Sequence, residues 1–215
     1  MSRGVPRLLA ITGPAGPSGS DMDLDPWLEA LGRSGVDGLQ VRRKELGGRA
    51  LLALAVRARA ALPAPAAVVV NGRLDVALAA GAAGVHLPAA GLPTREVRRL
   101  AEALGADVLI GRSTHHPDEV ARARDEGADY ALFGPVWATP GKERPSGAVG
   151  LAALERAAAH GLPVLALGGV EPGRFAELAV AGARGAAGIR MFRDAGGLGR
   201  LAREAARVFP PPAER

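Results

Sequence analysis

Short apolar runs alternate with longer segments of helical periodicity along this chain of 215 residues. Each run holds four or five residues, mostly Val, Leu, Ile, Ala and Gly. Strands that are buried on both faces have continuous apolar sequences of this kind, so the runs predict the strands of a parallel sheet. The eight runs are Leu8–Ile11, Gly38–Val41, Ala67–Val70, Gly84–Leu87, Asp107–Ile110, Tyr130–Phe133, Pro163–Leu167 and Gly185–Ile189.

The segments between the runs have the composition and the end signals of helices. Pro117 with Asp118 and Glu119 is typical of a helix start, and Gly81 and Gly105 follow segments that end there. Parallel strands need helical crossovers of this length between them. The predicted helices are Pro26–Arg33, Gly48–Ala61, Leu74–Ala80, Thr94–Leu104, Asp118–Glu126, Leu151–Ala159, Arg174–Ala181 and Leu198–Val208.

Strict alternation of eight strands and eight helices predicts an α/β fold of the (β/α)8 TIM-barrel class. An open, doubly wound sheet is the alternative, but it more often has about five to seven strands and a glycine-rich fingerprint after the first one. No such fingerprint follows Ile11. The eight units fill the chain without a linker, so we expect a single domain over residues 1–215 with loose ends at about 1–6 and 210–215.

Composition places this fold in a soluble protein without thiol chemistry. Hydrophobic residues make up 48% and charged residues 23% of the chain, as in ordinary globular proteins. The absence of cysteine excludes disulfides, thiolate metal sites and a cysteine nucleophile. The N-terminus lacks a signal-peptide pattern and no apolar stretch approaches about 18 residues, so we expect a cytoplasmic protein without membrane contact.

The net charge of +5 changes this picture little. The arginines are spread over the predicted helices with acidic residues nearby, which is the pattern of solvated helix faces. Aromatic residues make up only 3% of the chain, so nucleic-acid bases would find no stacking platform. We therefore expect no nucleic-acid partner.

Polar residues and glycines follow the predicted strands in distant parts of the sequence. In a barrel these positions share one rim, where active sites are built. Glycines after the seventh and eighth strands stand where barrels commonly hold a phosphate through backbone N–H groups, although they are also typical of ordinary tight turns. The rim residues are Gln40, Arg42, Lys44, Asn71, Gly72, Arg112, Ser113, His115, His116, Thr139, Lys142, Gly168, Gly169, Gly188, Ile189 and Arg190.

The cations on this rim favour an anionic small-molecule ligand. Arg42, Lys44 and Lys142 would stand on the same side as the glycines. The segment around Lys142 lacks the spacing of an NTPase phosphate loop, and Glu143 follows the lysine. No two carboxylates occupy the rim at a useful spacing, so we expect no tightly held metal ion.

Four histidines are candidates for general acid–base chemistry. His160 is explained by a helix end, and His86, at the end of the fourth run, by packing inside the barrel. His115 and His116 follow the fifth run, where one imidazole could face the pocket and shuttle a proton. Position alone does not choose between these two.

Several motifs on this rim resemble the thiamine phosphate synthase/TenI superfamily of barrels. The resemblance extends from about Leu8 to Phe192, and the motifs occur in the same order as in that superfamily. They are Gln40-Val41-Arg42-Arg43-Lys44, Asn71-Gly72-Arg73, Gly84-Val85-His86-Leu87-Pro88, Gly111-Arg112-Ser113-Thr114-His115, Asp129-Tyr130-Ala131-Leu132-Phe133-Gly134 and Leu167-Gly168-Gly169.

The superfamily contains two activities that the resemblance separates at Gly72 and Gly91. The synthase couples a hydroxymethylpyrimidine diphosphate to a thiazole phosphate carboxylate with the help of Mg²⁺, and its pattern has Asp at both positions. The TenI-type tautomerase, which aromatises a thiazole phosphate carboxylate tautomer without a metal ion, is similar to this chain where that pattern breaks. We therefore expect an isomerase, a thiazole tautomerase of thiamine biosynthesis, with doubtful synthase activity.

The resemblance also implies roles for individual residues. His115 matches the catalytic position of the family and would shuttle the proton, with thiazole phosphate as the ligand, no cofactor and a homodimer as a compatible assembly. Thiamine phosphate synthase, which the segment from Gln40 to Lys44 resembles more, and a non-catalytic regulatory protein that binds thiazole phosphate are the alternatives. The implied substrate contacts are Gln40, Arg42, Lys44, Asn71, Ser113, Thr139 and Lys142, and the implied phosphate contacts are Gly168, Gly169, Gly188, Ile189 and Arg190.

Overall fold

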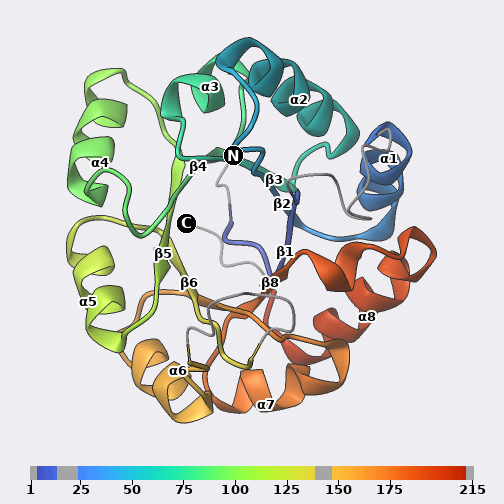
Figure 1. Cartoon of the computed structure of the whole chain (residues 1–215), viewed down its shortest axis with the longest axis vertical. Coiled ribbons are helices and arrows are strands. Elements are labelled where there is room, and N and C mark those ends of the chain that lie inside the picture. Colours follow the sequence, from blue (N-terminus) through green and yellow to red (C-terminus); the bar gives the residue numbers. More distant parts are fainter. Residues whose placement is uncertain (1–3, 14–23, 139–146, 212–215) are drawn as a thin grey trace.

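The expected barrel is confirmed in the computed structural model, which describes residues 4–13, 24–138 and 147–211. Every strand pairs in parallel with the next, and the first pairs with the last, so the sheet is closed and the open-sheet alternative is wrong. Figure 1 looks down the barrel, with the helices arranged in a ring around the strands. The strands are β1 (Leu8–Ile11), β2 (Gly38–Val41), β3 (Ala67–Asn71), β4 (Gly84–Leu87), β5 (Leu109–Thr114), β6 (Tyr130–Phe133), β7 (Val164–Leu167) and β8 (Gly185–Gly188).

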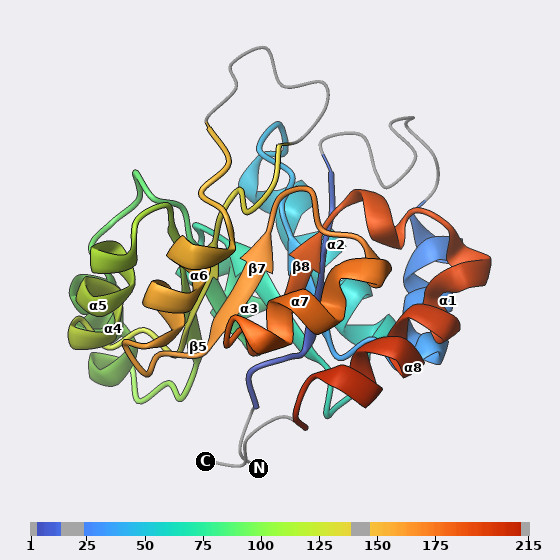
Figure 2. The same cartoon turned by 90° about the horizontal axis from the view of Figure 1, so that it is seen from below.

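The helices cover the outer face of the barrel, as the side view also shows (Figure 2). Their bounds agree with the predicted ones to within one residue, and short 3-10 turns precede α7 and α8. Within the described ranges, no helix is long and apolar enough to cross a membrane. The helices are α1 (Asp25–Ser34), α2 (Gly48–Ala61), α3 (Leu74–Ala79), α4 (Thr94–Ala103), α5 (Pro117–Asp125), α6 (Leu151–Ala158), α7 (Phe175–Val180) and α8 (Leu198–Val208), with the 3-10 turns η1 (Pro172–Arg174), η2 (Arg190–Phe192) and η3 (Ala195–Gly197).

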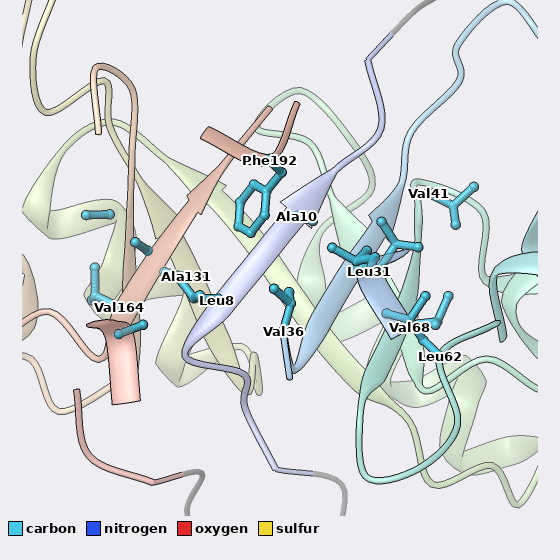
Figure 3. Packing of buried hydrophobic residues seen from close by; sticks show 14 of the residues in the cluster. Leu8, Ala10, Leu31, Val36, Val41, Leu62, Val68, Ala131, Val164 and Phe192 are labelled. Atoms are coloured by element: carbon cyan, nitrogen blue, oxygen red, sulfur yellow. The ribbon is translucent and has the colours of Figure 1, made fainter. Parts of the chain in front are cut away.

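Side chains of the strands contribute alternately to two packed layers. Leu8 and Ala10 of β1 belong to the cluster between barrel and helices, together with Leu31 of α1 (Figure 3). Leu9 and Ile11 of the same strand belong to a smaller cluster inside the barrel. Successive side chains of a strand point to opposite faces, and both faces are buried here, which explains why the runs are continuously apolar.

Two strands extend past their apolar runs, β3 by the single residue Asn71 and β5 by four residues. The run Asp107–Ile110 stops where the sequence becomes polar, whereas β5 continues to Thr114. The added residues pair with β6, and Ser113 stands opposite Leu132. Arg112 and Ser113 are therefore strand residues, and their prediction as part of the following loop is wrong. Their place in the strand makes their side chains point in opposite directions.

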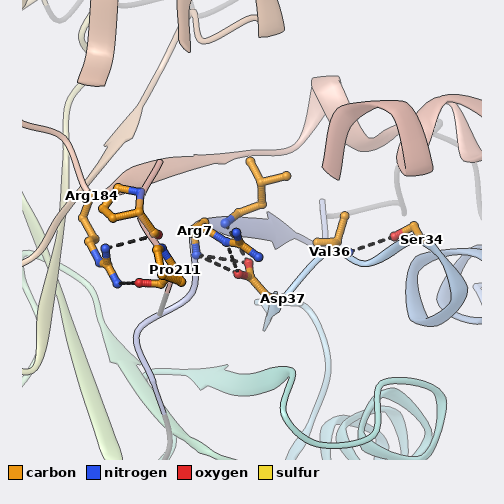
Figure 4. A network of polar contacts seen from close by, with 8 residues as sticks. Arg7, Ser34, Val36, Asp37, Arg184 and Pro211 are labelled. Carbon is orange, nitrogen blue, oxygen red and sulfur yellow. Dashed lines mark hydrogen bonds and ion pairs between the residues drawn. The ribbon is translucent and has the colours of Figure 1, made fainter. Parts of the chain in front are cut away.

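Polar contacts hold the N-terminal ends of the strands, opposite the rim (Figure 4). Asp37, just before β2, accepts hydrogen bonds from the backbone N–H groups of Arg7 and Leu8 and pairs with Nε of Arg7 at 3.1 Å. Arg184, just before β8, donates to the carbonyl oxygen of Pro211. The Asp37 carboxylate thus fastens the first two strands together at the end of the barrel away from the predicted site.

Candidate active site

A cavity of about 350 Å³ opens among the C-terminal ends of the strands, in the mouth of the barrel. A largely apolar cavity with a few polar groups that converge on it is typical of a small-molecule site. Ten of the residues expected from the sequence to contact a ligand line this cavity: Gln40, Arg42, Lys44, Asn71, Ser113, Gly168, Gly169, Gly188, Ile189 and Arg190. The other lining residues are Ile11, Pro88, Leu132, Leu167, Val170, Ala187 and Met191.

Two hydrogen bonds order the wall formed by β1, β2 and β3. Gln40 is buried, and its Nε2 donates to Oδ1 of Asn71 over 3.2 Å. Thr12, which follows β1, accepts a hydrogen bond at Oγ1 from the backbone N–H of Arg42 over 2.7 Å. These bonds join the C-terminal ends of β1, β2 and β3. They fix the backbone from which the side chains of Arg42 and Lys44 extend toward the cavity.

The charged side chains of the cavity lining are all basic. Arg42 and Lys44 come from the loop after β2 and Arg190 from the turn after β8, and no carboxylate is among the lining residues in the described part of the chain. Charges of one sign in a recessed site attract the opposite ion and raise its local concentration. The arrangement therefore suits an anion with several oxygen atoms.

Gly168 and Gly169 are required by packing as well as by the shape of the cavity. Their φ angles of +91° and +65° lie in the left-handed region that glycine adopts readily. A Cβ atom on Gly168 would lie 2.4 Å from Cβ of Pro135, and one on Gly169 would lie 2.6 Å from Cβ of Trp137. The loop after β6 therefore closes on the loop after β7, and a phosphate contact at these glycines stays a prediction.

A buried histidine connects the cavity with the barrel interior. His86 of β4 is 1% exposed, with Nε2 at 2.9 Å from Oγ of Ser113 and Nδ1 at 3.3 Å from the hydroxyl of Tyr130. Burial above all, then the nearby charges of Arg112 and Arg42, lower the pKa of His86 to about 3. The imidazole is therefore neutral near pH 7. Sequence reasoning missed its contact with a cavity residue, although a lone polar residue in an apolar run was a signal.

His115 lies on the rim but is not among the residues that line the cavity. The residue is exposed, and its Nδ1 is 2.5 Å from the carbonyl oxygen of Gly134. Glu119, in the first turn of α5, accepts hydrogen bonds from the backbone N–H groups of His115 and His116. These contacts order the start of α5, and neither histidine is part of the described cavity wall.

Gly72 and Gly91, where the resemblance puts the metal-binding carboxylates of the synthase, both adjoin Pro88. A Cβ atom on Gly72 would lie 3.7 Å from Cδ of Pro88, and one on Gly91 would lie 3.1 Å from it. The two positions are thus neighbours in space, yet neither bears a carboxylate. Among the residues that the structure describes, no group of three or more His, Asp or Glu side chains could hold a metal ion. These residues do not fit a divalent cation bound in that way.

Arg112 fixes the loop that carries Gly91. Its guanidinium group donates to the carbonyl oxygens of Ala89 over 2.9 Å and of Leu92 over 2.6 Å. The loop between β4 and α4 is therefore held against β5 by a cation of the protein itself.

A second cavity of about 620 Å³ adjoins the first and shares Gly169, Val170, Arg190 and Met191 with it. On its wall the guanidinium group of Arg174 lies over the ring of Trp137, 4.5 Å from the ring centroid. Two expected substrate contacts, Thr139 and Lys142, lie outside the described residues. Their part in the site stays a prediction.

Comparison with known proteins gives consistent matches over most of the chain. A family model described as "Thiamine monophosphate synthase" matches residues 8–192. The thiamine-phosphate synthase of Methanoculleus marisnigri is 45% identical over 157 residues, which cover 72% of this chain and 73% of that protein. The thiamine-phosphate synthase of Anaeromyxobacter dehalogenans is 44% identical over 156 residues, which cover 72% and 69%. Among solved structures, a thiamine phosphate pyrophosphorylase from Pyrococcus furiosus matches with a TM-score of 0.77 and 25% identity, covering 95% of this chain and 98% of that one.

These names correct the activity expected from the sequence. Relatives with identities from 37% to 45% are named thiamine-phosphate synthase, so the expectation of a thiazole tautomerase, an isomerase with doubtful synthase activity, is wrong. That expectation depended on Gly72 and Gly91, two loop positions, and on His115, which is not in the cavity wall. The synthase-like residues Arg42 and Lys44, in contrast, do line the cavity.

Proposed function

Because this chain belongs to the thiamine monophosphate synthase family, we propose that it is a transferase that forms thiamine phosphate. In this proposal a hydroxymethylpyrimidine diphosphate and a thiazole phosphate bind in the mouth of the barrel, where they are coupled as diphosphate leaves. The observation that carries the proposal is the recessed cavity whose charged side chains, in the described part of the chain, are all basic.

Arg42, Lys44 and Arg190 are the groups that would bind phosphate oxygens. Arginine can present two parallel N–H donors to such a group, and a charged hydrogen bond is about twice as strong as a neutral one. Negative charge grows on the diphosphate as it leaves, and cations already in place stabilise it without having to reorient. The proposed step uses these side chains and no divalent cation, since Gly72 and Gly91 provide no carboxylate.

The amide pair of Gln40 and Asn71 suits a heterocyclic ring. Their mutual hydrogen bond uses one N–H of Gln40 and one lone pair of the Asn71 oxygen, which leaves the carbonyl oxygen and the second N–H of Gln40 and both N–H groups of Asn71 for the edge of a ring. Ile11 and Leu132 add apolar surface to the same cavity for the faces of the ring. The ring and the phosphate of one substrate would therefore contact different parts of the wall.

The purified protein, supplied with both precursors, is expected to form thiamine phosphate, which oxidation to a fluorescent thiochrome makes measurable. Arg42→Met is expected to lower kcat/KM by about 100-fold or more, because it removes a cation aimed at the leaving group. Arg49→Met, on the exposed side of α2, is the matched control and should change little. Binding of both precursors without any thiamine phosphate would overturn the proposal in favour of a non-catalytic binding protein.

A further inference from the structure

Tyr130, His86 and Ser113 form a chain of hydrogen-bonding side chains that leads from the barrel interior to the cavity. They come from the neighbouring strands β6, β4 and β5. The Tyr130 hydroxyl is 3.3 Å from Nδ1 of His86, and Nε2 of His86 is 2.9 Å from Oγ of Ser113. Tyr130 is 0% exposed and His86 1% exposed, whereas Ser113 lines the cavity. This row of three side chains is therefore closed off at Tyr130 and open to the cavity at Ser113.

The closed end sets the direction of every hydrogen bond in the chain. Within the described residues, the Tyr130 hydroxyl has no hydrogen-bond partner besides Nδ1 of His86. A buried hydroxyl without an acceptor costs free energy, so Tyr130 donates and Nδ1 accepts. The neutral imidazole then carries its one proton on Nε2 and donates it to Oγ of Ser113.

Ser113 is left with one hydrogen atom to donate. Its Oγ already accepts from His86, and the residue belongs to the cavity wall. A hydroxyl hydrogen rotates freely about the C–O bond, so it can turn toward a ligand oxygen in the cavity. Ser113 thereby has the same preference as the basic side chains of Arg42 and Lys44 in that wall, which also donate hydrogen bonds.

Gly111 provides the space that this chain of contacts needs. It stands opposite His86 in the pairing of β4 with β5, and opposite Tyr130 in the pairing of β5 with β6. A Cβ atom on Gly111 would lie 2.2 Å from Cζ of Tyr130 and 2.6 Å from Nδ1 of His86. Only a residue without a side chain lets the phenol reach the imidazole across the middle strand.

We propose that Tyr130 and His86 are positioning residues that fix the Ser113 hydroxyl as a hydrogen-bond donor toward the cavity. The Ser113 hydroxyl then donates a hydrogen bond to a phosphate oxygen in the cavity. A ligand group that can only donate hydrogen bonds is disfavoured at this position. The identity of the ligand rests on the proposed function, whereas the order of the hydrogen bonds does not depend on it. The two ideas can therefore fail separately.

The proton position on His86 can be measured directly by NMR of protein labelled with ¹⁵N in its histidine rings. His86→Gln assigns the signals of His86 by their loss. We expect the Nε2-protonated tautomer in the native protein, unchanged between about pH 5.5 and 8. In Tyr130→Phe the donor to Nδ1 is gone, and the Nδ1-protonated tautomer should become populated. A native His86 protonated on Nδ1 would overturn the proposal.

The effect on the ligand is measured by titrating inorganic pyrophosphate calorimetrically into the native protein and three variants. Ser113→Ala should weaken binding about tenfold, Tyr130→Phe by a smaller factor, and the double variant no more than Ser113→Ala alone. Additive losses, or unchanged affinity in Ser113→Ala, would contradict the proposal. Phe133→Leu, which shortens a buried side chain of β6 in the outer layer, is the control and should alter neither the tautomer nor the affinity.

The outcome remains clear whichever variant is affected in folding. Circular dichroism identifies a variant that has lost the native structure, and the tautomer of the native protein tests the order of the hydrogen bonds without any variant of Tyr130. If the native protein forms no thiamine phosphate, the proposed function fails while the NMR result for His86 still decides the present inference.

Discussion

Gln40 donates a hydrogen bond to Asn71 over 3.2 Å, and both amides line the cavity in the mouth of the barrel. In the described part of the protein, all charged side chains that line this cavity are basic. Asn71→Asp keeps the acceptor for Gln40 but adds a negative charge near Arg42 and Lys44. The new carboxylate and the bound pyrophosphate carry like charges, which several ångströms apart at a protein surface repel by about 2 kcal/mol or more. The affinity for pyrophosphate should therefore fall at least about tenfold. Isothermal titration calorimetry measures this change.

Ala103→Asp, on the exposed side of α4, adds the same charge away from the cavity and serves as the matched control. Its affinity for pyrophosphate should stay close to that of the native protein. Equal losses in both variants would mean that the overall charge of the protein decides binding, and not the cavity.

Pyrophosphate is expected to bind no more weakly in EDTA than in Mg²⁺. Gly72 and Gly91 offer no carboxylate that could share a cation with the ligand, and Mg²⁺ in solution neutralises part of the charge of pyrophosphate. Calorimetric titration in EDTA should therefore give an affinity equal to or higher than that in Mg²⁺. A much weaker interaction in EDTA would show that a cation bridges the protein and the anion after all.

Gly72→Asp makes this comparison sharper. Aspartate tolerates the left-handed region better than most residues, the φ angle of Gly72 is +67°, and the nearest atom to an added Cβ is at an ordinary 3.7 Å. We expect this variant to bind pyrophosphate more weakly in EDTA and to recover part of the loss in Mg²⁺. Gly91→Asp is less suitable because its Cβ would lie 3.0 Å from the carbonyl oxygen of Pro88.

His86 should make the protein less stable in acid. Burial lowers the pKa of His86 to about 3 in the folded protein, whereas the pKa of a histidine in the unfolded chain is about 6.5. Between these values the unfolded chain binds a proton that the folded protein does not, so stability falls as the pH is lowered through this window, by up to about 1.4 kcal/mol per pH unit. Above about pH 6.5 this contribution is constant.

Urea unfolding at about pH 7.5 and at about pH 5 measures this dependence. His86→Gln should reduce the difference between the two pH values, even if the variant is less stable at both. His160→Gln, at a partly exposed position just after α6, should leave the difference as it is in the native protein. A native protein of equal stability at both pH values would contradict the assignment of a neutral, buried His86.

Asp37→Ala should destabilise the barrel by about 2–4 kcal/mol, because it leaves two backbone N–H groups and the guanidinium group of Arg7 without their acceptor. The measurement is the free energy of unfolding in urea. Glu29→Ala removes an exposed partner of Arg33 in α1 and should cost less than about 0.5 kcal/mol. Similar values for the two variants would contradict a special role for Asp37 in joining β1 to β2.

The barrel was predictable because its strands are buried on both faces and its helices end at glycines. The extension of β5 was not, since Gly111 to Thr114 contains no apolar run and its pairing depends on β6. The rim residues could be collected from strand ends alone, because parallel strands bring their C-terminal ends together.

The direction of individual side chains could not be predicted in the same way. The sequence places His115 just after the fifth strand, but only the fold shows that its Nδ1 is hydrogen-bonded to the carbonyl oxygen of Gly134. The partners of His86 come from two other strands, so no local pattern contains them. The choice of activity from Gly72 and Gly91 gave two loop positions more weight than the similarity of the whole chain supports.

The absence of a side chain at Gly111 links the evolution of three strands. A family member with even a methyl group at this place on β5 cannot keep both a tyrosine at the place of Tyr130 and a histidine at the place of His86, because the added carbon would overlap each of them. Substitutions on β4, β5 and β6 should therefore occur together whenever β5 gains a side chain here. Such an exchange would also remove the side chains that orient Ser113, so it would change the ligand preference.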